Sequence, residues 1–211
     1  MIAQSNVISL VIIAGMVIAF AGAAYVWAVP LIEKRASVTE YDTVERFMLE
    51  LNDKIVSIAN TGSGTAALKI PKGNLNLKPY NFAGDVNNTL TLDFYVSQPL
   101  IVEGGSVPLK TSTLDYIGEY GNAEPRTILM SRIPDTGKIH LNVTMRYREL
   151  RSNVPKGYVI ALCPVTDLEG CQNEISGRNS IKVSYGGTFV VPRNIEDGGE
   201  LLITKISIEA T

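Results

Sequence analysis

The chain is poor in the side chains that carry most enzyme chemistry. Its 211 residues include one histidine, His140, and two cysteines, Cys163 and Cys171. One histidine and two cysteines cannot complete a tetrahedral zinc site without carboxylate ligands. The sequence also has no Gly-x-Gly-x-x-Gly or P-loop nucleotide-binding motif, no paired-histidine metalloprotease motif and no Gly-x-Ser-x-Gly nucleophile turn. We therefore expect no catalysis, no cofactor and no bound metal.

Charge is also nearly balanced, and the first charged side chain comes late. Lys and Arg number 19 against 21 Asp and Glu, which gives a formal net charge of -2. Scattered basic residues in such a balance do not form the positive surface that binds nucleic acid. No charged residue precedes Glu33. This beginning, apolar or small at most positions, differs sharply from the polar, Gly- and Pro-punctuated remainder.

The apolar run from Val7 to Ile32 is long enough to span a membrane. A helix of this length reaches about 39 Å, against a hydrocarbon core of about 30 Å. A cleaved secretion signal would have a basic start and a core of about 7–15 residues, so the sequence favours a transmembrane helix. Tyr25 and Trp27 lie where an aromatic belt is expected. Small residues spaced four apart allow close helix contact, although Gly and Ala are also common in membrane helices generally.

A second helical stretch is predicted after the apolar run. Pro30 removes a backbone donor and should kink or end the first helix. Ser37-Val38-Thr39-Glu40 then has the spacing of a capping box. Apolar side chains recur at steps of three and four, which predicts an amphipathic helix over residues 37–62, ending near Gly62. The apolar stripe consists of Tyr41, Val44, Met48, Leu51, Ile55 and Ile58.

Residues 63–211 are predicted to form a β-domain. Apolar and polar side chains alternate most clearly over residues 139–147, which is typical of a half-buried strand. The other predicted strands are residues 65–70, 88–96, 126–132, 158–163, 180–185, 188–191 and 201–210. Turn residues separate them, including Gly186-Gly187 between two of the strands. We therefore expect an α+β fold, with a long N-terminal helix followed by an antiparallel, immunoglobulin-like β-sandwich.

The β-domain contains three kinds of candidate site. His140 falls on the polar face of its strand, and we interpret it as a solvated surface side chain. Cys163 and Cys171 are expected to form a disulfide in an oxidising compartment; the alternative is two free thiols. Asn87-Asn88-Thr89 and Asn142-Val143-Thr144 match the N-glycosylation pattern. Asn87 and Asn142 are therefore predicted glycan acceptors.

The order of these segments resembles the type IV pilin superfamily, in particular archaeal pilins and archaellins. The residues that carry the resemblance are Ala3-Gln4-Ser5 and the run VISLVIIAGMVIAFAGAAYVWAVPLI. The resemblance implies that residues 1–3 are a short leader, removed at the Ala3–Gln4 bond by a prepilin peptidase-like protease. Family leaders usually carry Lys or Arg, which residues 1–3 lack, and bacterial members carry an early Glu that is also absent.

The same resemblance implies a location and a set of partners. Residues 4–36 would lie in the cytoplasmic membrane of the precursor and later form the core of an extracellular filament, extracted by an assembly ATPase and its platform. Each subunit would contact copies of itself, and the β-domains would form the outer surface. The predicted filament-core positions are Val7, Leu10, Val11, Ala14, Gly15, Ile18, Ala19, Gly22, Ala23, Trp27 and Pro30.

One sequence signal opposes this topology. Lys34 and Arg35 follow the apolar run, and by the positive-inside tendency they favour a cytoplasmic β-domain. The paired cysteines and the glycosylation patterns favour an extracellular one. We give the second group more weight, because Glu33 reduces the net charge beside the run to +1.

The sequence therefore predicts a structural pilin that serves adhesion or surface contact. Two alternatives stay open. The first is a membrane-anchored extracellular binding module or minor accessory pilin that does not polymerise in bulk. The second is an anchored hydrolase that uses His140 or a carboxylate pair.

Overall fold

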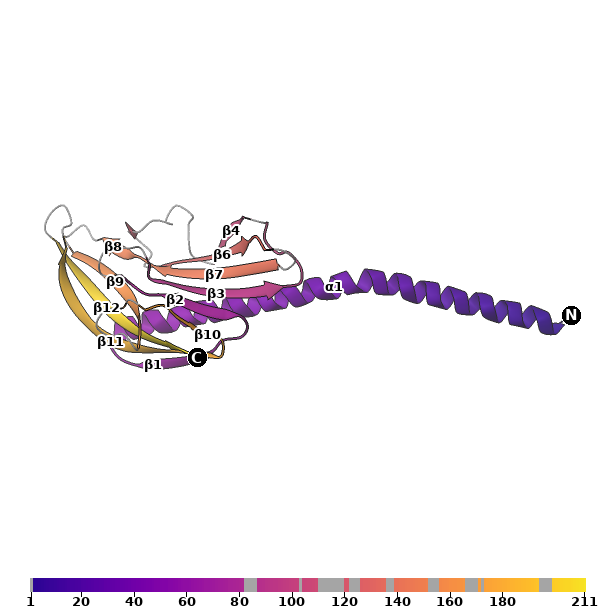
Figure 1. The fold of residues 1–211 in the computed structure, drawn as a ribbon, viewed down its shortest axis with the longest axis horizontal. Coiled ribbons are helices and arrows are strands. Elements are labelled where there is room, and N and C mark those ends of the chain that lie inside the picture. The colour runs from indigo at the N-terminus through magenta and orange to yellow at the C-terminus, as the bar shows by residue number, and fades with distance from the viewer. Residues whose placement is uncertain are drawn as a thin grey trace.

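The computed structural model describes most of the chain. The described residues are 2–81, 87–102, 104–109, 120–121, 126–135, 139–151, 156–165, 171, 173–193 and 199–211. Side chains are described for these residues except 2–8, 120–121, 126–127, 151 and 193. One long N-terminal helix projects from a domain of two β-sheets, which is an α+β architecture (Figure 1).

The helix α1 (Ile2–Thr61) runs without interruption through Pro30. The predicted capping box at Ser37 therefore does not form, because Ser37 already lies inside a helix and needs no cap. A proline removes one backbone hydrogen bond, and a long helix tolerates that loss by bending. Figure 1 shows α1 as one gently bent rod. The helix ends as predicted, where Gly62 adopts a φ of 65° and its N–H donates to Ile58 O at 3.1 Å.

The two sheets hold strands that are distant in sequence. The first has the order β1 (Thr65–Lys69), β11 (Ser180–Arg193), β12 (Gly199–Ala210), β9 (Lys156–Pro164), β8 (Glu149–Arg151) and β5 (Tyr120–Gly121). The second has the order β10 (Ile175–Gly177), β2 (Asn74–Lys78), β3 (Thr89–Val96), β7 (Ile139–Tyr147), β6 (Arg126–Ile133) and β4 (Ser106–Pro108). Most pairs are antiparallel, but β12 with β9 and β5 with β8 are parallel. The predicted antiparallel pairing is therefore confirmed for most strands, and these two parallel pairs are the exceptions.

The predicted turn at Gly186-Gly187 was wrong. Residues on both sides belong to the single strand β11, and its register with β12 shifts between Tyr185 and Gly187. Gly187 has a φ of 114°, and a Cβ at Gly186 would lie 2.8 Å from Ser207 Oγ. These two glycines therefore form a β-bulge. Gly187 adopts a left-handed backbone conformation, and Gly186 leaves room for the side chain of Ser207.

The main core forms where the second half of α1 meets both sheets. The helix contacts β1, β11 and β12 of the first sheet and β7 of the second. Val44, Met48, Leu51 and Ile55 are at most 1% exposed, which confirms the predicted stripe. The helix also carries a buried amide that the stripe did not predict: Tyr147 OH donates to Asn52 Oδ1 at 3.0 Å. This hydrogen bond joins α1 to the second sheet.

A second apolar cluster lies on the other face of the first sheet. Its buried members are Val159, Ala161, Cys163, Cys171, Leu201 and Ile203. The strand β9 therefore contributes side chains to two cores, which explains why almost every position along it is buried. The sequence of such a strand is a continuous run of apolar residues and does not alternate between apolar and polar residues.

Candidate assembly helix and its neck

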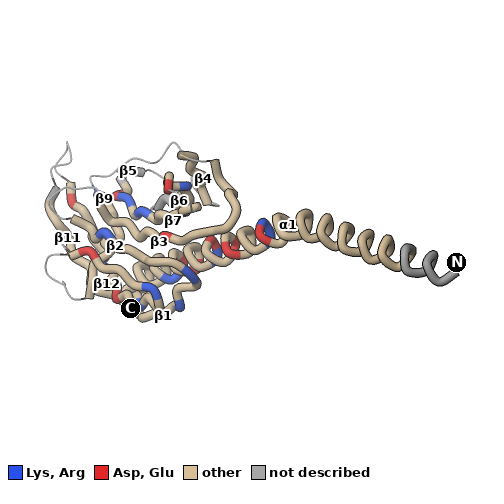
Figure 2. The backbone as a smooth tube through the Cα atoms, turned by 45° about the vertical axis from the view of Figure 1, so that its right-hand side comes forward, with Lys and Arg blue, Asp and Glu red and all other residues tan. Residues whose placement is uncertain are grey.

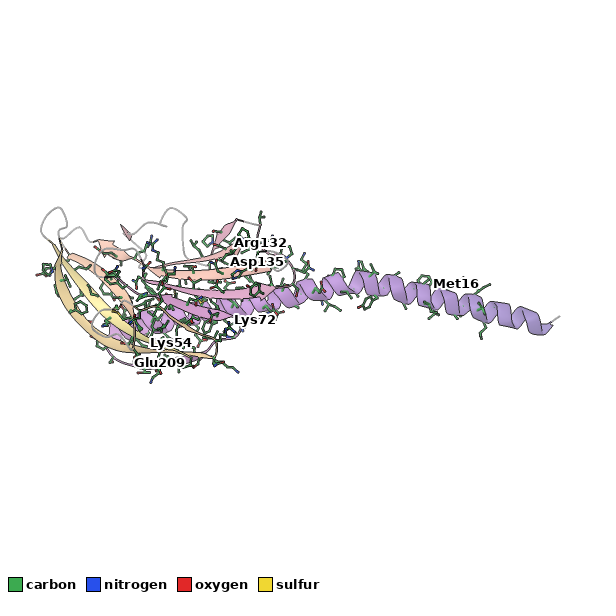
Figure 3. All side chains as sticks on the ribbon, viewed as in Figure 1. Met16, Lys54, Lys72, Arg132, Asp135 and Glu209 are labelled. Atoms are coloured by element: carbon green, nitrogen blue, oxygen red, sulfur yellow. A yellow bond between two sulfur atoms is a disulfide. The ribbon has the colours of Figure 1, made fainter. Side chains whose placement is uncertain are left out.

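The first half of α1 is apolar and has no cover. From Ser9 to Trp27 every described side chain is exposed, with Leu10, Ile18, Phe20 and Trp27 at 70–75%. Among the described residues, α1 is the helix whose length and composition suit a membrane span. Figure 3 shows Met16 projecting from this half with no domain side chain near it. A surface of this size needs lipid or another protein to cover it.

The structure places the predicted filament-core residues on this uncovered half. Leu10, Val11, Ala14, Gly15, Ile18, Ala19, Gly22, Ala23, Trp27 and Pro30 are all exposed. A Cβ added at Gly15 or Gly22 would meet nothing within 4 Å, so a second helix has room to approach both glycines. The backbone of Ala3, Gln4 and Val7 is helical, and their side chains lie outside the described set.

The β-domain contacts α1 through polar side chains at residues 33–40, a segment that we call the neck. Gln98, after β3, donates its Nε2–H to Glu33 Oε2 at 2.9 Å and its backbone N–H to Ser37 Oγ at 3.0 Å. Ser37 is only 1% exposed. Lys72, between β1 and β2, forms an ion pair with Glu40 at 2.7 Å. Two separate loops thus fix the direction in which the apolar half leaves the domain.

A buried asparagine ties the two sheets together. Asn88 is 2% exposed and has a φ of 77°. Its Nδ2 donates to Tyr147 O in β7 at 3.1 Å and to Ile160 O in β9 at 2.8 Å. Its Oδ1 accepts the N–H of Leu162 in β9 at 2.9 Å. Sequence reasoning missed this role, because Asn88 was considered only as the middle residue of a glycosylation pattern.

The two predicted glycan acceptors lie in different environments. Asn87 is exposed, beside the buried Asn88. Asn142 lies in β7, between β3 and β6, where it pairs with Asp93 and Ser131. Its side chain is half-buried, and its Oδ1 is buried without a hydrogen-bond partner. The exposed Asn87 is the better placed of the two for a glycan.

His140 is less solvated than its place on the polar strand face predicted. Its side chain is 19% exposed and stacks on the Tyr95 ring, with the ring centroids 4.8 Å apart. Its Nε2 lies 3.3 Å from Asp93 Oδ1, within ion-pair distance but without hydrogen-bond geometry. The described residues contain no group of three or more His, Cys, Asp or Glu side chains that could hold a metal ion. The contact that the structure does show for the His140 ring is its stacking on Tyr95.

Cys163 and Cys171 form a disulfide with their Cα atoms 4.8 Å apart. Cys163 is the penultimate residue of β9, and both cysteines are buried in the second apolar cluster. The bond links two positions that are 8 residues apart in the sequence. The expected disulfide is therefore present, and the alternative of two free thiols does not hold.

Removing this disulfide should weaken the β-domain without abolishing its fold. We expect the Cys163→Ala/Cys171→Ala variant to lose about 2–3 kcal/mol of unfolding free energy, since closing a short loop constrains the unfolded chain. Urea denaturation of the detergent-solubilised protein, followed by circular dichroism, measures this loss. An unchanged denaturation midpoint would show that the bond has no stabilising role.

Comparisons with protein-family models, with curated proteins and with solved structures find no match to this chain. The functional argument therefore depends on the chain's own geometry.

Proposed function

We propose that this chain is a structural subunit of an extracellular, pilus-like helical filament that serves adhesion or surface contact. The observation that supports this proposal most strongly is the contrast within α1. One half buries an apolar stripe in the β-domain, whereas the other half is apolar and is exposed at every residue from Ser9 to Trp27. In the precursor this half lies in the cytoplasmic membrane, and in the filament it packs against copies of itself.

The transfer from lipid to filament gains little hydrophobic free energy, because both surroundings are apolar. Packing must therefore favour the assembled state, and small residues such as Gly15, Ala19 and Gly22 permit close helix contact. A membrane-associated ATPase and its platform would drive extraction after a prepilin peptidase-like protease has cut at Ala3–Gln4. Each subunit meets the next head-to-tail through a contact that does not close, which gives an open helical polymer.

The β-domain forms the outer surface in this proposal. We assign it to the immunoglobulin-like sandwiches as part of the same proposal. Two largely antiparallel sheets that share one core support this assignment. The parallel pair of β12 and β9 is a departure from a purely antiparallel sandwich.

The same exposed helix also suits a membrane anchor, so a second function is proposed alongside the first. In that case the chain is an anchored binding module or an accessory pilin that never polymerises in bulk. Abundance separates the two functions, since a major pilin dominates the material sheared from the cell surface and an accessory subunit does not.

N-terminal mass spectrometry of sheared surface filaments tests the leading proposal. We expect this chain to be the main component and its first residue to be Gln4. Recovery of the chain only in the membrane fraction, with Met1 still present, would refute the proposal and support the anchor. Peptide mapping of the same sample shows whether Asn87 carries a glycan.

A further inference from the structure

The second half of α1 has one face that the β-domain leaves uncovered. Asp42, Arg46, Glu50 and Lys54 are all exposed on it, each four residues from the next. Their charges alternate in sign along the helix. Figure 2 shows acidic and basic residues gathered on this half of α1, whereas the described part of the N-terminal half carries none before the neck. We call these four side chains the charged ridge.

Within the described part of the β-domain, no ion pair reaches a ridge side chain. The ion pairs of Lys72 with Glu40 and of His140 with Asp93 include no ridge residue. Neighbouring Asp53 is different, because its Oδ1 accepts a hydrogen bond from Asn52 at 3.1 Å. The four ridge side chains are thus available to an external partner of alternating charge.

The position of the ridge indicates where that partner lies. The buried stripe of α1 faces the β-domain, so the ridge lies on the side of the helix turned away from the domain core. If the domains form the outside of a filament, the uncovered side of each helix faces the filament axis. Ridges of neighbouring copies then converge there. Charges brought together away from bulk water are costly unless they are paired.

We propose that the charged ridge docks against the ridge of a second copy, displaced along the helix by one four-residue step of about 6 Å. This inference rests on the proposed function. At this offset Arg46, Glu50 and Lys54 of one copy face Asp42, Arg46 and Glu50 of its neighbour, and all three pairs have opposite charge. At zero offset, or at about 12 Å, like charges face each other and repel. The ridge therefore selects the stagger between neighbouring subunits.

Charge reversal tests the stagger in cells that make the filament. Arg46→Glu turns two of the three facing pairs into like charges, and we expect the yield of sheared filaments to fall at least tenfold. The fourfold inversion Asp42→Lys, Arg46→Glu, Glu50→Lys and Lys54→Glu restores all three pairs, and its yield should return to within twofold of wild type. Lys69→Glu, at an exposed position on β1 outside the ridge, is the matched control and should leave the yield unchanged.

Mixed filaments give a second readout. When wild-type and inverted chains are co-expressed, like charges face each other at every ridge contact between them, so the two forms should segregate into separate filaments. Normal yield from Arg46→Glu, or free mixing of the two forms, would overturn the ridge contact while leaving the filament itself intact. If the wild-type chain makes no filament at all, the proposed function fails as well. Circular dichroism of each variant confirms that the domain is folded.

Discussion

Replacing Asn88 with alanine should cost the β-domain about 3–5 kcal/mol of unfolding free energy. The alanine would remove three buried side-chain hydrogen bonds, and the carbonyls of Tyr147 and Ile160 and the N–H of Leu162 would lose those partners. Alanine is also less suited than asparagine to the φ of 77° at this position. Because the three groups belong to β7 and β9, the loss should loosen the contact between the two sheets. Urea denaturation followed by circular dichroism measures the change.

The neighbouring residue provides the matched control. Asn87 is exposed, so Asn87→Ala should change the unfolding free energy by less than about 0.5 kcal/mol. Both substitutions remove one asparagine from the same tripeptide. If any change in this segment lowered the unfolding free energy, both variants would therefore be destabilised. Equal stability of the Asn88→Ala and Asn87→Ala variants would contradict the role of Asn88 as a tie between the sheets.

Enlarging a small residue on the exposed helix should stop filament assembly and leave membrane insertion intact. Ala19→Leu keeps the helix apolar, so the precursor should reach the membrane at its normal level. The larger side chain would hold neighbouring helices apart, and we expect at least about a tenfold fall in sheared filaments. Quantitative immunoblots of the membrane and sheared fractions measure both levels.

Ile18→Leu is the control for this substitution, since it conserves volume at an adjacent exposed position. It should leave both fractions unchanged. A normal filament yield from Ala19→Leu would show that close contact at this position is unnecessary. A loss from the membrane fraction would instead indicate failed insertion, and the substitution would then have to be read as a membrane defect.

The sequence predicted correctly the helix and the strands that bury only one of their faces, because apolar side chains then recur with the period of the helix or strand. The stripe from Val44 to Ile58 faces a single core, and β7 alternates because one of its faces is polar. The sequence also predicted the extent of the apolar half of α1. This half is apolar on all sides of the helix, whereas a helix at the edge of a domain core is apolar on one side only. In these places local pattern and tertiary contact agree.

Other features depend on contacts that no local pattern contains. Pro30 and Ser37 suggested a break in the helix, but a continuous α1 is held at its neck by Gln98, far away in sequence. Gly186-Gly187 suggested a turn, and the long partner strand β12 makes it a bulge. Asn88 and Asn52 are buried polar residues whose partners lie in other elements. Polar residues of this kind are expected at the surface unless the partners are known.

Electron cryomicroscopy of sheared filaments most directly tests whether residues 9–32 exchange lipid for copies of themselves. The account predicts a central bundle in which these helices touch one another and the β-domains lie outside, with neighbouring ridges offset by about 6 Å. Filaments built from another protein, with this helix still in the bilayer and in contact with no second copy, would contradict it.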